Sequence, residues 1–491
     1  MVKEKRRHSP LFLSPWTFLA FSILVTSIRN KRLLLPYLLP YGPAVDIPIR
    51  HRPKCVTTPV FVDDDDHHHH DANVVSLRMS SKGSKSTKIY ERFDDEEDVG
   101  RNKEPLLLNP ETIIFDHHGN MYVMNENSML VMLTDFVEES RKNEKNDDDD
   151  DANPVVVMTA KAIEVADLGI GRPLGGKFDR NGCLYFADAI LGLARVCHLP
   201  GVANTATTSS SSSPRPIVEL VASRVKLEDG SWSSINYADD VDVGPRTGHV
   251  YFTDATDVHT DRDVVRTGGR WDILYASKVE GMRGKRTGRL LRYMPETGEV
   301  DVLATGAAFA NGVSVMDEEE TRVMYTSTFE AVVMMHRLNG NGKGGGGGGG
   351  EEEEGGGAER VLDGFPGLLD GIDCPRSSRR GLCYVAIVTT LSPSVNAIFS
   401  MTPSWLGRIV RSILMMIPRS WSPPAERYGG VAEIYVGDDD ENGSGPTPRI
   451  TRIFQDVDGR DFSTITGVTE HGGKLYLGSL HADYVGVVSL D

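Results

Sequence analysis

Six segments of this chain repeat one hairpin pattern, and this repetition constrains the possible fold more than any other feature. Each segment has an apolar residue, in most cases followed by an acid, then a turn that usually contains glycine, then an apolar–Tyr–apolar strand. Alternation on both sides of a turn is typical of two antiparallel strands. The segments are residues 115–125, 178–188, 241–254, 313–327, 372–388 and 468–480, with Tyr122, Tyr185, Tyr251, Tyr325, Tyr384 and Tyr476 in their second strands.

The spacing of the repeats predicts how they are arranged. Successive tyrosines are 59 to 92 residues apart, more than the roughly 40–50 residues of a four-stranded propeller blade. Insertions such as the Gly/Glu tract at 344–357 account for the excess, and further strands are expected at 273–280 and on both sides of a turn within 288–304. Units that each expose a sheet face need neighbours, and a closed ring supplies them. The sequence therefore predicts an all-β fold, a six-bladed β-propeller over residues 104–491.

Charge and cysteine content exclude some classes of function. The net charge of −17 is concentrated in acidic runs at 63–66, 147–151, 351–354 and 438–440. No basic stripe is present to follow a nucleic-acid backbone, so nucleic acid is excluded as a partner. Five cysteines without a CxxC pair indicate neither a disulfide scaffold nor a zinc site. Cys374 and Cys383 flank a predicted hairpin loop, where they either pair across it or remain buried thiols.

The N-terminal region predicts a membrane anchor and a tether. Basic residues flank an apolar run of 18 residues at 11–28, just long enough to cross a bilayer core of about 30 Å. We expect residues 1–35 to be a basic tail and an uncleaved anchor, with a cleaved signal peptide as the alternative. The propeller is then expected on the lumenal or extracellular side, at the endoplasmic reticulum or plasma membrane, or secreted after cleavage. Residues 36–103 contain few apolar side chains and are expected to be a disordered tether.

The residues that enter the first strand of each hairpin form a candidate metal site. In a propeller these strands line the axis, so the residues that enter them converge. Carboxylates and an amide offer only oxygen ligands, which favours Ca²⁺ over Mg²⁺. Singly, each acid also fits a turn or strand-entry role. The candidates are Glu111, Arg172, Asp239 or Asp240, Asn311, Asp370, and Thr466 or Gly467.

Several motifs together resemble the strictosidine synthase-like family, and within it the adipocyte plasma membrane-associated protein branch. They are GRPLGGKFDRNGCLYFADAILGLARV, YADDVDVGPRTGHVYFTD, FANGVSV, LDGFPG and EHGGKLYLGSL, and the similarity extends from about residue 106 to the C-terminus. The wider superfamily includes paraoxonases and gluconolactonases, which are six-bladed propellers with calcium in the channel. The resemblance implies that Glu111, Asp239, Asn311 and Asp370 are the metal ligands.

Two departures from the family pattern affect the expected activity. Asp239 stands where the family usually has asparagine, which keeps an oxygen ligand but adds a charge. Strictosidine synthases use a glutamate just before the EHxG motif for acid–base chemistry. Thr466 and Gly467 occupy that stretch here, and neither takes up a proton, so strictosidine synthesis is not expected. His117 and His118 lie in a hairpin turn and are expected to face solvent.

Residues 392–428, between the fifth and sixth repeats, form an insertion with a predicted helix at 404–417. Apolar residues such as Ile409 and Ile413 recur at helical spacing, with Arg408, Arg411 and Ser412 on the opposite face. Pro418 closes the predicted helix. The helix is expected either to lie on a membrane surface or over the channel mouth, or to pack against a blade.

Two functions follow from these features. The first is a calcium-dependent hydrolase of small esters or lactones, with arylesterase-like chemistry. A bound cation polarises the substrate carbonyl, Asp240 or Asp370 serves as the general base, and Arg172 orients an anionic group. The alternative is a non-catalytic propeller in which calcium is structural and the surface binds a partner.

Overall fold

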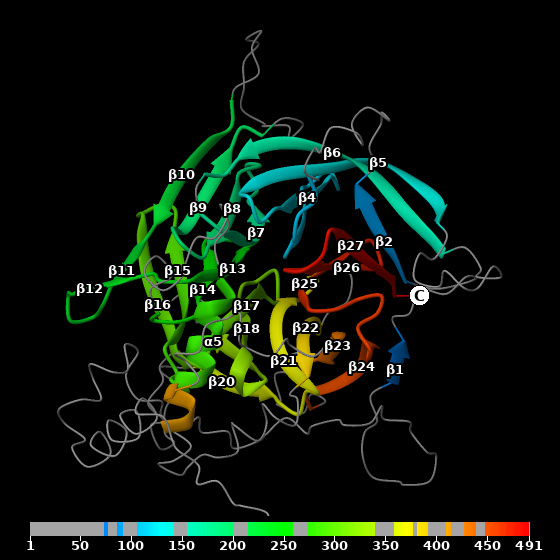
Figure 1. Ribbon diagram of the computed structural model, residues 1–491. Helices are drawn as coiled ribbons and strands as arrows, with labels where there is room; N and C mark the ends of the chain where they lie inside the picture. Colours follow the sequence, from blue (N-terminus) through cyan, green and yellow to red (C-terminus); the bar gives the residue numbers. More distant parts are fainter. Residues whose placement is uncertain are drawn as a thin grey trace, which may run out of the picture.

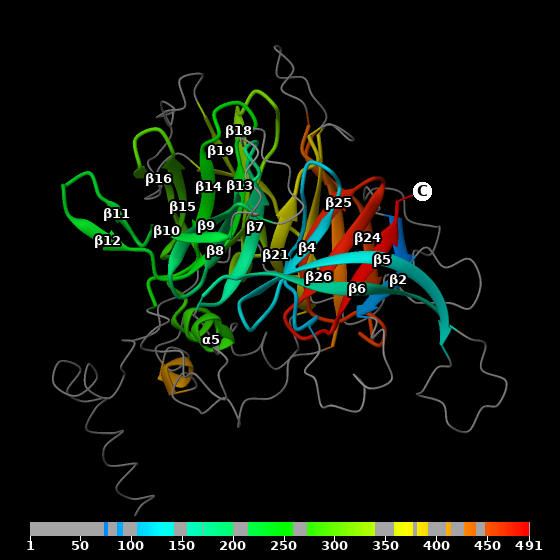
Figure 2. The ribbon, with the colours of Figure 1, turned by 90° about the horizontal axis from the view of Figure 1, so that it is seen from above.

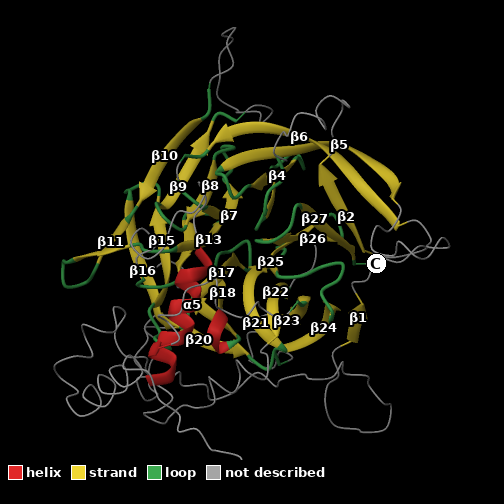
Figure 3. Ribbon diagram, viewed as in Figure 1, coloured by secondary structure: helices red, strands yellow, loops and turns green. Residues whose placement is uncertain are grey.

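The computed structural model contains an all-β molecule, as predicted. It describes residues 73–76, 86–91, 106–141, 155–169, 171–199, 215–258, 273–338, 358–376, 381–390, 409–413, 427–437 and 447–490. Strands dominate these residues, and the few helical segments gather in one part of the view in Figure 3. Any description of the fold below refers to these ranges.

The described strands form antiparallel groups of four, in which each strand pairs with the next along the chain. One sheet holds two such groups because β2 pairs antiparallel with β27 and parallel with β6. The groups are β3 (Ile113–Phe115), β4 (Met121–Met124), β5 (Met129–Arg141) and β6 (Val155–Asp167); β7 (Pro173–Phe178), β8 (Leu184–Asp188), β9 (Gly192–Cys197) and β10 (Ile217–Ala222); β13 (Ala238–Val243), β14 (Val250–Asp254), β15 (Gly288–Met294) and β16 (Glu299–Ala307); β17 (Ala310–Val315), β18 (Arg322–Ser327), β19 (Val332–Arg337) and β20 (Ala358–Leu362); β21 (Gly367–Asp373), β22 (Leu382–Thr390), β23 (Gly429–Tyr435) and β24 (Arg449–Asp456); and β25 (Ile465–His471), β26 (Lys474–Ser479), β27 (Tyr484–Ser489) and β2 (Ser86–Glu91).

The first strands of these groups surround a common centre. Each of β3, β7, β13, β17, β21 and β25 contacts the next, and β25 contacts β3, so the contacts close into a ring. In Figure 1 these strands lie toward the middle of the molecule and the later strands of each group lie farther out. The six predicted hairpins are the first two strands of each group, which confirms them.

The hydrophobic core lies between neighbouring groups. Apolar clusters fill the spaces between successive groups around the ring. The repeat tyrosines lie on the second strands, and five of them are at most 2% exposed, whereas Tyr476 is only partly buried. Tyr122, for example, packs on Phe178 of the next group with ring centroids 5.2 Å apart. The repeated tyrosine is therefore a packing residue that joins one group to its neighbour.

Residues 273–280, which we predicted as a strand, are helical. They belong to α5 (Ile273–Arg283). The prediction was wrong because burial recurs at Ile273, Ala276, Val279 and Glu280, which is helical spacing and not alternation. The two strands predicted within 288–304 are confirmed as β15 and β16, joined by a turn at 295–298.

The segment expected to be a disordered tether contains two strands. β1 (Asn73–Ser76) pairs parallel with β24, and β2 completes the last group. Within β2, Ile89 is buried and the Lys88 ammonium lies 4.3 Å from the centre of the Tyr484 ring. The segment has little apolar surface of its own, but a strand with partners on both sides has its backbone hydrogen bonds supplied by its neighbours.

The remaining elements are short. β11 (Arg224–Lys226) and β12 (Trp232–Ser234) form a separate hairpin, and the 3₁₀ turn η1 (Thr328–Glu330) follows β18. Two disulfides are present, Cys374–Cys383 and Cys183–Cys197. The first is the pairing that we considered across a hairpin loop, and the second was not predicted because Cys183 and Cys197 become neighbours only when β8 and β9 pair.

No helix among the residues described here is long and apolar enough to cross a bilayer. This finding contradicts the expected placement as a single-pass membrane protein with its propeller on the lumenal or extracellular side. The predicted anchor at 11–28 lies outside the described ranges.

Candidate functional site

The six residues predicted at the axis occupy equivalent positions in the structure. Each lies within two residues of the start of a first strand, in β13, β17, β21 and β25 or directly before β3 and β7. All are at most 7% exposed. They are Glu111, Arg172, Asp239, Asn311, Asp370 and Thr466.

Glycines let the first strands approach one another at this level. A Cβ atom on Gly312 would lie 2.4 Å from the Ile372 backbone nitrogen, and one on Gly467 would lie 2.0 Å from the Glu111 carbonyl oxygen. Both separations are shorter than any real Cβ contact, so a side chain at either position would push two first strands apart. Glycine directly after Asn311 and Thr466 therefore allows the entry residues to come together.

Three of the predicted metal ligands are buried carboxylates that influence one another. Burial raises the pKa of Glu111 to about 8, while the Arg172 charge lowers it and the Asp240 charge raises it. Burial also raises the pKa of Asp239 and of Asp370 well above the usual value, and Glu111 raises both further. A hydrogen bond from the Asn311 side chain to Asp370 opposes that shift. The ring of first strands thus brings four residues from distant parts of the chain into electrostatic contact.

Each of the three carboxylates has an oxygen without a hydrogen-bond partner. These atoms are Glu111 Oε2, Asp239 Oδ2 and Asp370 Oδ1, and all three are buried. Among the described residues, no group of three or more His, Cys, Asp or Glu side chains is arranged so that it could hold a metal ion as it stands. The chemistry of the donors therefore fits a hard cation, which prefers oxygen ligands, but coordination would require the side chains to move toward one another.

Arg172 is committed to neighbouring groups. Its guanidinium is buried and donates to the Pro173 carbonyl at 2.9 Å and to the Asn109 carbonyl at 3.4 Å. The charges of Glu111 and Glu126 favour its protonated form. These contacts make Arg172 a counter-charge for Glu111, and leave it less suited to the substrate-orienting role that the sequence suggested.

Asp240 lies between the buried carboxylates and a cavity. Its Oδ1 accepts the Val241 N–H at 2.8 Å and its Oδ2 accepts the Val313 N–H at 3.0 Å. Burial raises the pKa of Asp240 to about 7, although both hydrogen bonds oppose the shift. The position combines contact with Glu111 on one side and open space on the other.

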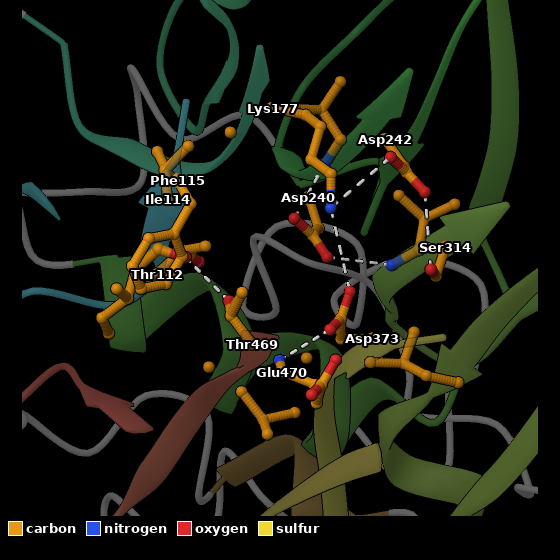
Figure 4. A pocket seen from close by; sticks show the side chains of 18 of the residues that line it. Thr112, Ile114, Phe115, Lys177, Asp240, Asp242, Ser314, Asp373, Thr469 and Glu470 are labelled. Carbon is orange, nitrogen blue, oxygen red and sulfur yellow. Dashed lines mark hydrogen bonds and ion pairs between the residues drawn. The ribbon is translucent and has the colours of Figure 1, made fainter. Parts of the chain in front are cut away.

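The cavity has a volume of about 200 Å³ and lies toward the carboxyl ends of the first strands. Figure 4 shows the Lys177 ammonium among the carboxylates of Asp240, Asp242 and Asp373. Its Nζ is 3.9 Å from Asp242 Oδ1 and 3.8 Å from Asp373 Oδ1. We call this end, with Lys177, Asp240, Asp242, Asp373 and Glu470, the charged mouth.

Sequence reasoning missed Asp242 and Asp373, although a signal was present. Both occupy the acidic position of the repeat, which Asp116 and Asp179 also occupy. Asp116 and Asp179 accept hydrogen bonds from the N–H groups of their own turns, whereas Asp242 accepts the Val315 N–H of the next group at 2.8 Å and pairs with Arg376. The same residue at the same repeat position thus caps a turn in some groups and faces the cavity in others.

The opposite end of the ring is apolar and lies under a helix. Residues before the first strands and after the second strands form a buried cluster with α5. The Phe309 ring lies 5.3 Å from that of Tyr237 and 5.7 Å from that of Phe329. In Figure 2, α5 and the helical residues 409–413 lie on the same side of the sheets. We call this end the apolar mouth, and its members are Leu174, Tyr237, Phe309, Phe329 and Leu480.

The insertion helix has a different orientation from the one that we predicted. Of residues 404–417, the structure describes 409–413, which are helical. Arg411 and Ser412, expected on the polar face, are buried, and Ile413, expected on the apolar face, is 45% exposed. Arg411 Nη1 donates to the Met282 carbonyl at 3.3 Å. The contact with the end of α5 therefore decides which face is covered, and hydrophobic spacing alone did not reveal it.

The remaining predicted positions have no acid–base group. Thr466 is buried, and its Oγ1 has no hydrogen-bond partner. A side chain at Gly467 would meet the Glu111 backbone. His117 and His118 are exposed, as predicted, and His117 Nε2 lies 2.8 Å from the Asp179 carbonyl.

Comparisons with known proteins confirm the family resemblance. Residues 239–339 match the family model of strictosidine synthase. Strictosidine synthase-like protein 2 of Arabidopsis thaliana is 27% identical over 321 residues, 65% of this chain and 71% of that protein. The adipocyte plasma membrane-associated protein of Homo sapiens is 28% identical over 331 residues, 65% of this chain and 64% of that protein. The chain is thus related to both groups, and it spans slightly less than two thirds of the length of the human protein.

Solved structures with a similar course of the chain include two from the wider superfamily. A gluconolactonase of Xanthomonas campestris has a TM-score of 0.40 and 11% identity, over 78% of this chain and 87% of its own. A calcium-binding protein, regucalcin, of Agrobacterium tumefaciens has a TM-score of 0.38 and 12% identity, over 85% of this chain and 95% of its own. Similarity at this level has no bearing on activity.

Proposed function

We propose, from the kinship with strictosidine synthase-like proteins, that this chain is a six-bladed β-propeller that hydrolyses small esters or lactones with the help of one calcium ion at its axis. Glu111, Asp239, Asn311 and Asp370 are the proposed ligands. The observation that carries the proposal is the set of three buried carboxylates, from three different first strands, that each keep an oxygen without a partner.

Energetics favour a cation over three isolated acids. An unpaired buried carboxylate costs several kcal/mol, and a bound cation removes that cost. The available donors are oxygens only, and a flexible oxygen shell suits Ca²⁺ better than Mg²⁺, which demands strict octahedral geometry. Asp239 brings a third carboxylate, and Asn311 adds a neutral amide oxygen. Binding then requires the carboxylates to approach one another further than they do here.

The bound cation would polarise the substrate carbonyl and stabilise the negative charge that develops on its oxygen. Asp240 is the proposed general base, because its carboxylate lines a cavity with room for water and lies beside Glu111. Asp370 is the alternative base if it is not fully used as a ligand. Arg172 holds the Glu111 carboxylate through charge and so positions a ligand.

A non-catalytic propeller with structural calcium is the second candidate. The observation that favours it is the apolar mouth, where α5 packs over Tyr237 and Phe309 and leaves this end of the axis covered. Strictosidine synthesis itself is not proposed, since Gly467 has no room for a side chain and Thr466 cannot act as an acid or base at neutral pH.

The test is turnover of aryl acetates and lactones by the full chain, before and after removal of divalent cations with a chelator. The proposal predicts activity that chelation abolishes and that Ca²⁺ restores. Glu111→Gln should lose activity and calcium affinity while circular dichroism stays unchanged. Glu359→Gln is the matched control, because Glu359 is exposed on β20 and pairs only loosely with Arg337 at 3.6 Å. Calcium binding without turnover over a broad ester panel would favour the non-catalytic alternative.

A further inference from the structure

We propose that Lys177 gates the route by which a cation reaches the buried carboxylates, and that this route is the charged mouth. The inference rests on the proposed calcium site. It assigns to Lys177 a role in the rate of cation exchange, separate from the residues that bind the ion.

The cavity at the charged mouth leads directly to the proposed ligands. Its lining includes Thr112, Asp240 and Gly371, which are the immediate chain neighbours of Glu111, Asp239 and Asp370. The inner end of the cavity therefore lies next to the oxygens that have no partner. A small ion that enters the cavity needs to pass only one residue level along the first strands.

The other end of the ring offers no comparable route. The residues there are apolar and buried, and α5 packs so closely that a Cβ on Gly281 would lie 2.8 Å from the Phe329 ring. A hydrated divalent ion pays a large desolvation cost in such surroundings. The carboxylates of Asp240, Asp242 and Asp373, in contrast, provide a negative path with polar partners.

Lys177 occupies that path. Its ammonium stands among the three carboxylates in Figure 4, and its two ion pairs, at 3.8 and 3.9 Å, are longer than the roughly 2.7–2.9 Å of a strong charge-assisted hydrogen bond. The side chain is 35% exposed, so solvent is within reach of its flexible stem. A cation that enters the cavity is repelled by the ammonium, and the path opens when Lys177 turns outward.

The two acids beside Lys177 are held by other contacts. Asp242 accepts the Val243 N–H and the Val315 N–H, each at 2.8 Å, and pairs with Arg376. Asp373 Oδ2 accepts the Glu470 N–H at 2.7 Å. Because these contacts do not involve the lysine, the mouth keeps its shape when Lys177 moves away, and a Lys177→Met variant should fold normally.

Stopped-flow luminescence of Tb³⁺, used as the probe in place of Ca²⁺, tests the inference on the full chain. Lys177→Met should make both association and chelator-induced release faster, by roughly tenfold, because a like charge has left a focused path. Lys177→Arg keeps the charge and the reach and should stay slow. Lys226→Met, on the exposed face of β11, removes the same charge away from the cavity and is the matched control.

Each outcome has one meaning. Faster association and faster release in Lys177→Met alone support the gate. Faster association with slower release would show that the lysine acts only through its charge on affinity, and equal rates would show that it does not act on exchange; both results overturn the gate while the calcium site stands. Absence of Tb³⁺ and Ca²⁺ binding by the unmodified chain would overturn the proposed site and the gate together.

Discussion

The two mouths of the ring of first strands have opposite chemistry although one repeat builds both. At the charged mouth, cohesion comes from ion pairs and from N–H groups that point at Asp242 and Asp373. At the apolar mouth it comes from aromatic rings under α5. The repeat therefore places residues at an end of the axis, but the residue type at each position decides whether that end admits water and ions or excludes them.

The largest expected effect is at the charged mouth. Asp242→Ala leaves the Arg376 guanidinium and two backbone N–H groups without their acceptor, and we expect a loss of about 3–5 kcal/mol in the free energy of unfolding. Urea denaturation measures it. Asp242→Asn keeps the shape and one acceptor, so it should lose less. A loss below about 1 kcal/mol for the alanine variant, as for an exposed pair, would contradict a buried role for Asp242.

At the apolar mouth we expect a comparable but smaller loss. Phe309 is 3% exposed and joins the rings of Tyr237 and Phe329, so Phe309→Ala should cost about 3 kcal/mol. Phe309 also has a backbone φ of 68°, which glycine tolerates better, so Phe309→Gly should recover up to about 1 kcal/mol of that loss. Added salt should leave both values unchanged. A strong salt dependence would blur the contrast between the mouths.

A buried histidine outside either mouth provides a reference for pH effects. His336 on β19 is 2% exposed, and neither ring nitrogen has a hydrogen-bond partner. Burial, together with the Arg292 charge, lowers the pKa of His336 below its usual 6.5. The unfolded chain therefore binds a proton first as the pH falls, and stability should decrease below pH 6.5 by about 1–2 kcal/mol near pH 5.

His336→Phe isolates this contribution. The variant should lose less stability than the unmodified chain between pH 7 and pH 5, as followed by thermal unfolding. Identical pH profiles for the two proteins would mean that the ring gains a partner in solution.

The smallest expected effect is that of Lys177 on stability. Its ion pairs are long and its side chain is partly exposed, so Lys177→Met should change the free energy of unfolding by less than about 1 kcal/mol. Combined with a changed rate of cation exchange, this would separate a gate from a structural residue. A loss as large as that of Asp242→Ala would instead place Lys177 in the framework of the charged mouth.

Particular residues show how far sequence reasoning reached. Alternation around Tyr122, Tyr185 and the other repeat tyrosines predicted the hairpins, because period-two burial is a local property of a strand. Counting back from those tyrosines also led to Glu111, Asn311 and Asp370, which the structure brings into electrostatic contact. Equivalent positions in a repeat point the same way, and this holds before any coordinates are known.

The failures have a common cause. α5 was taken for a strand because eight residues are too few to distinguish the two periods. β2 was missed because its partners, β27 and β6, come from opposite ends of the chain. Arg411 was placed on the wrong face because its burial depends on the end of α5, more than a hundred residues earlier.

The sequence by itself determined the repeat, the strand hairpins and the residue type at each axial position, since these depend on local alternation and turn chemistry. Only the tertiary structure decided which acids cap their own turns and which face the cavity, and which end of the ring lies under a helix. The physical reason is that burial, electrostatic contact and coverage are properties of pairs of segments, and the pairs that matter here are far apart along the chain.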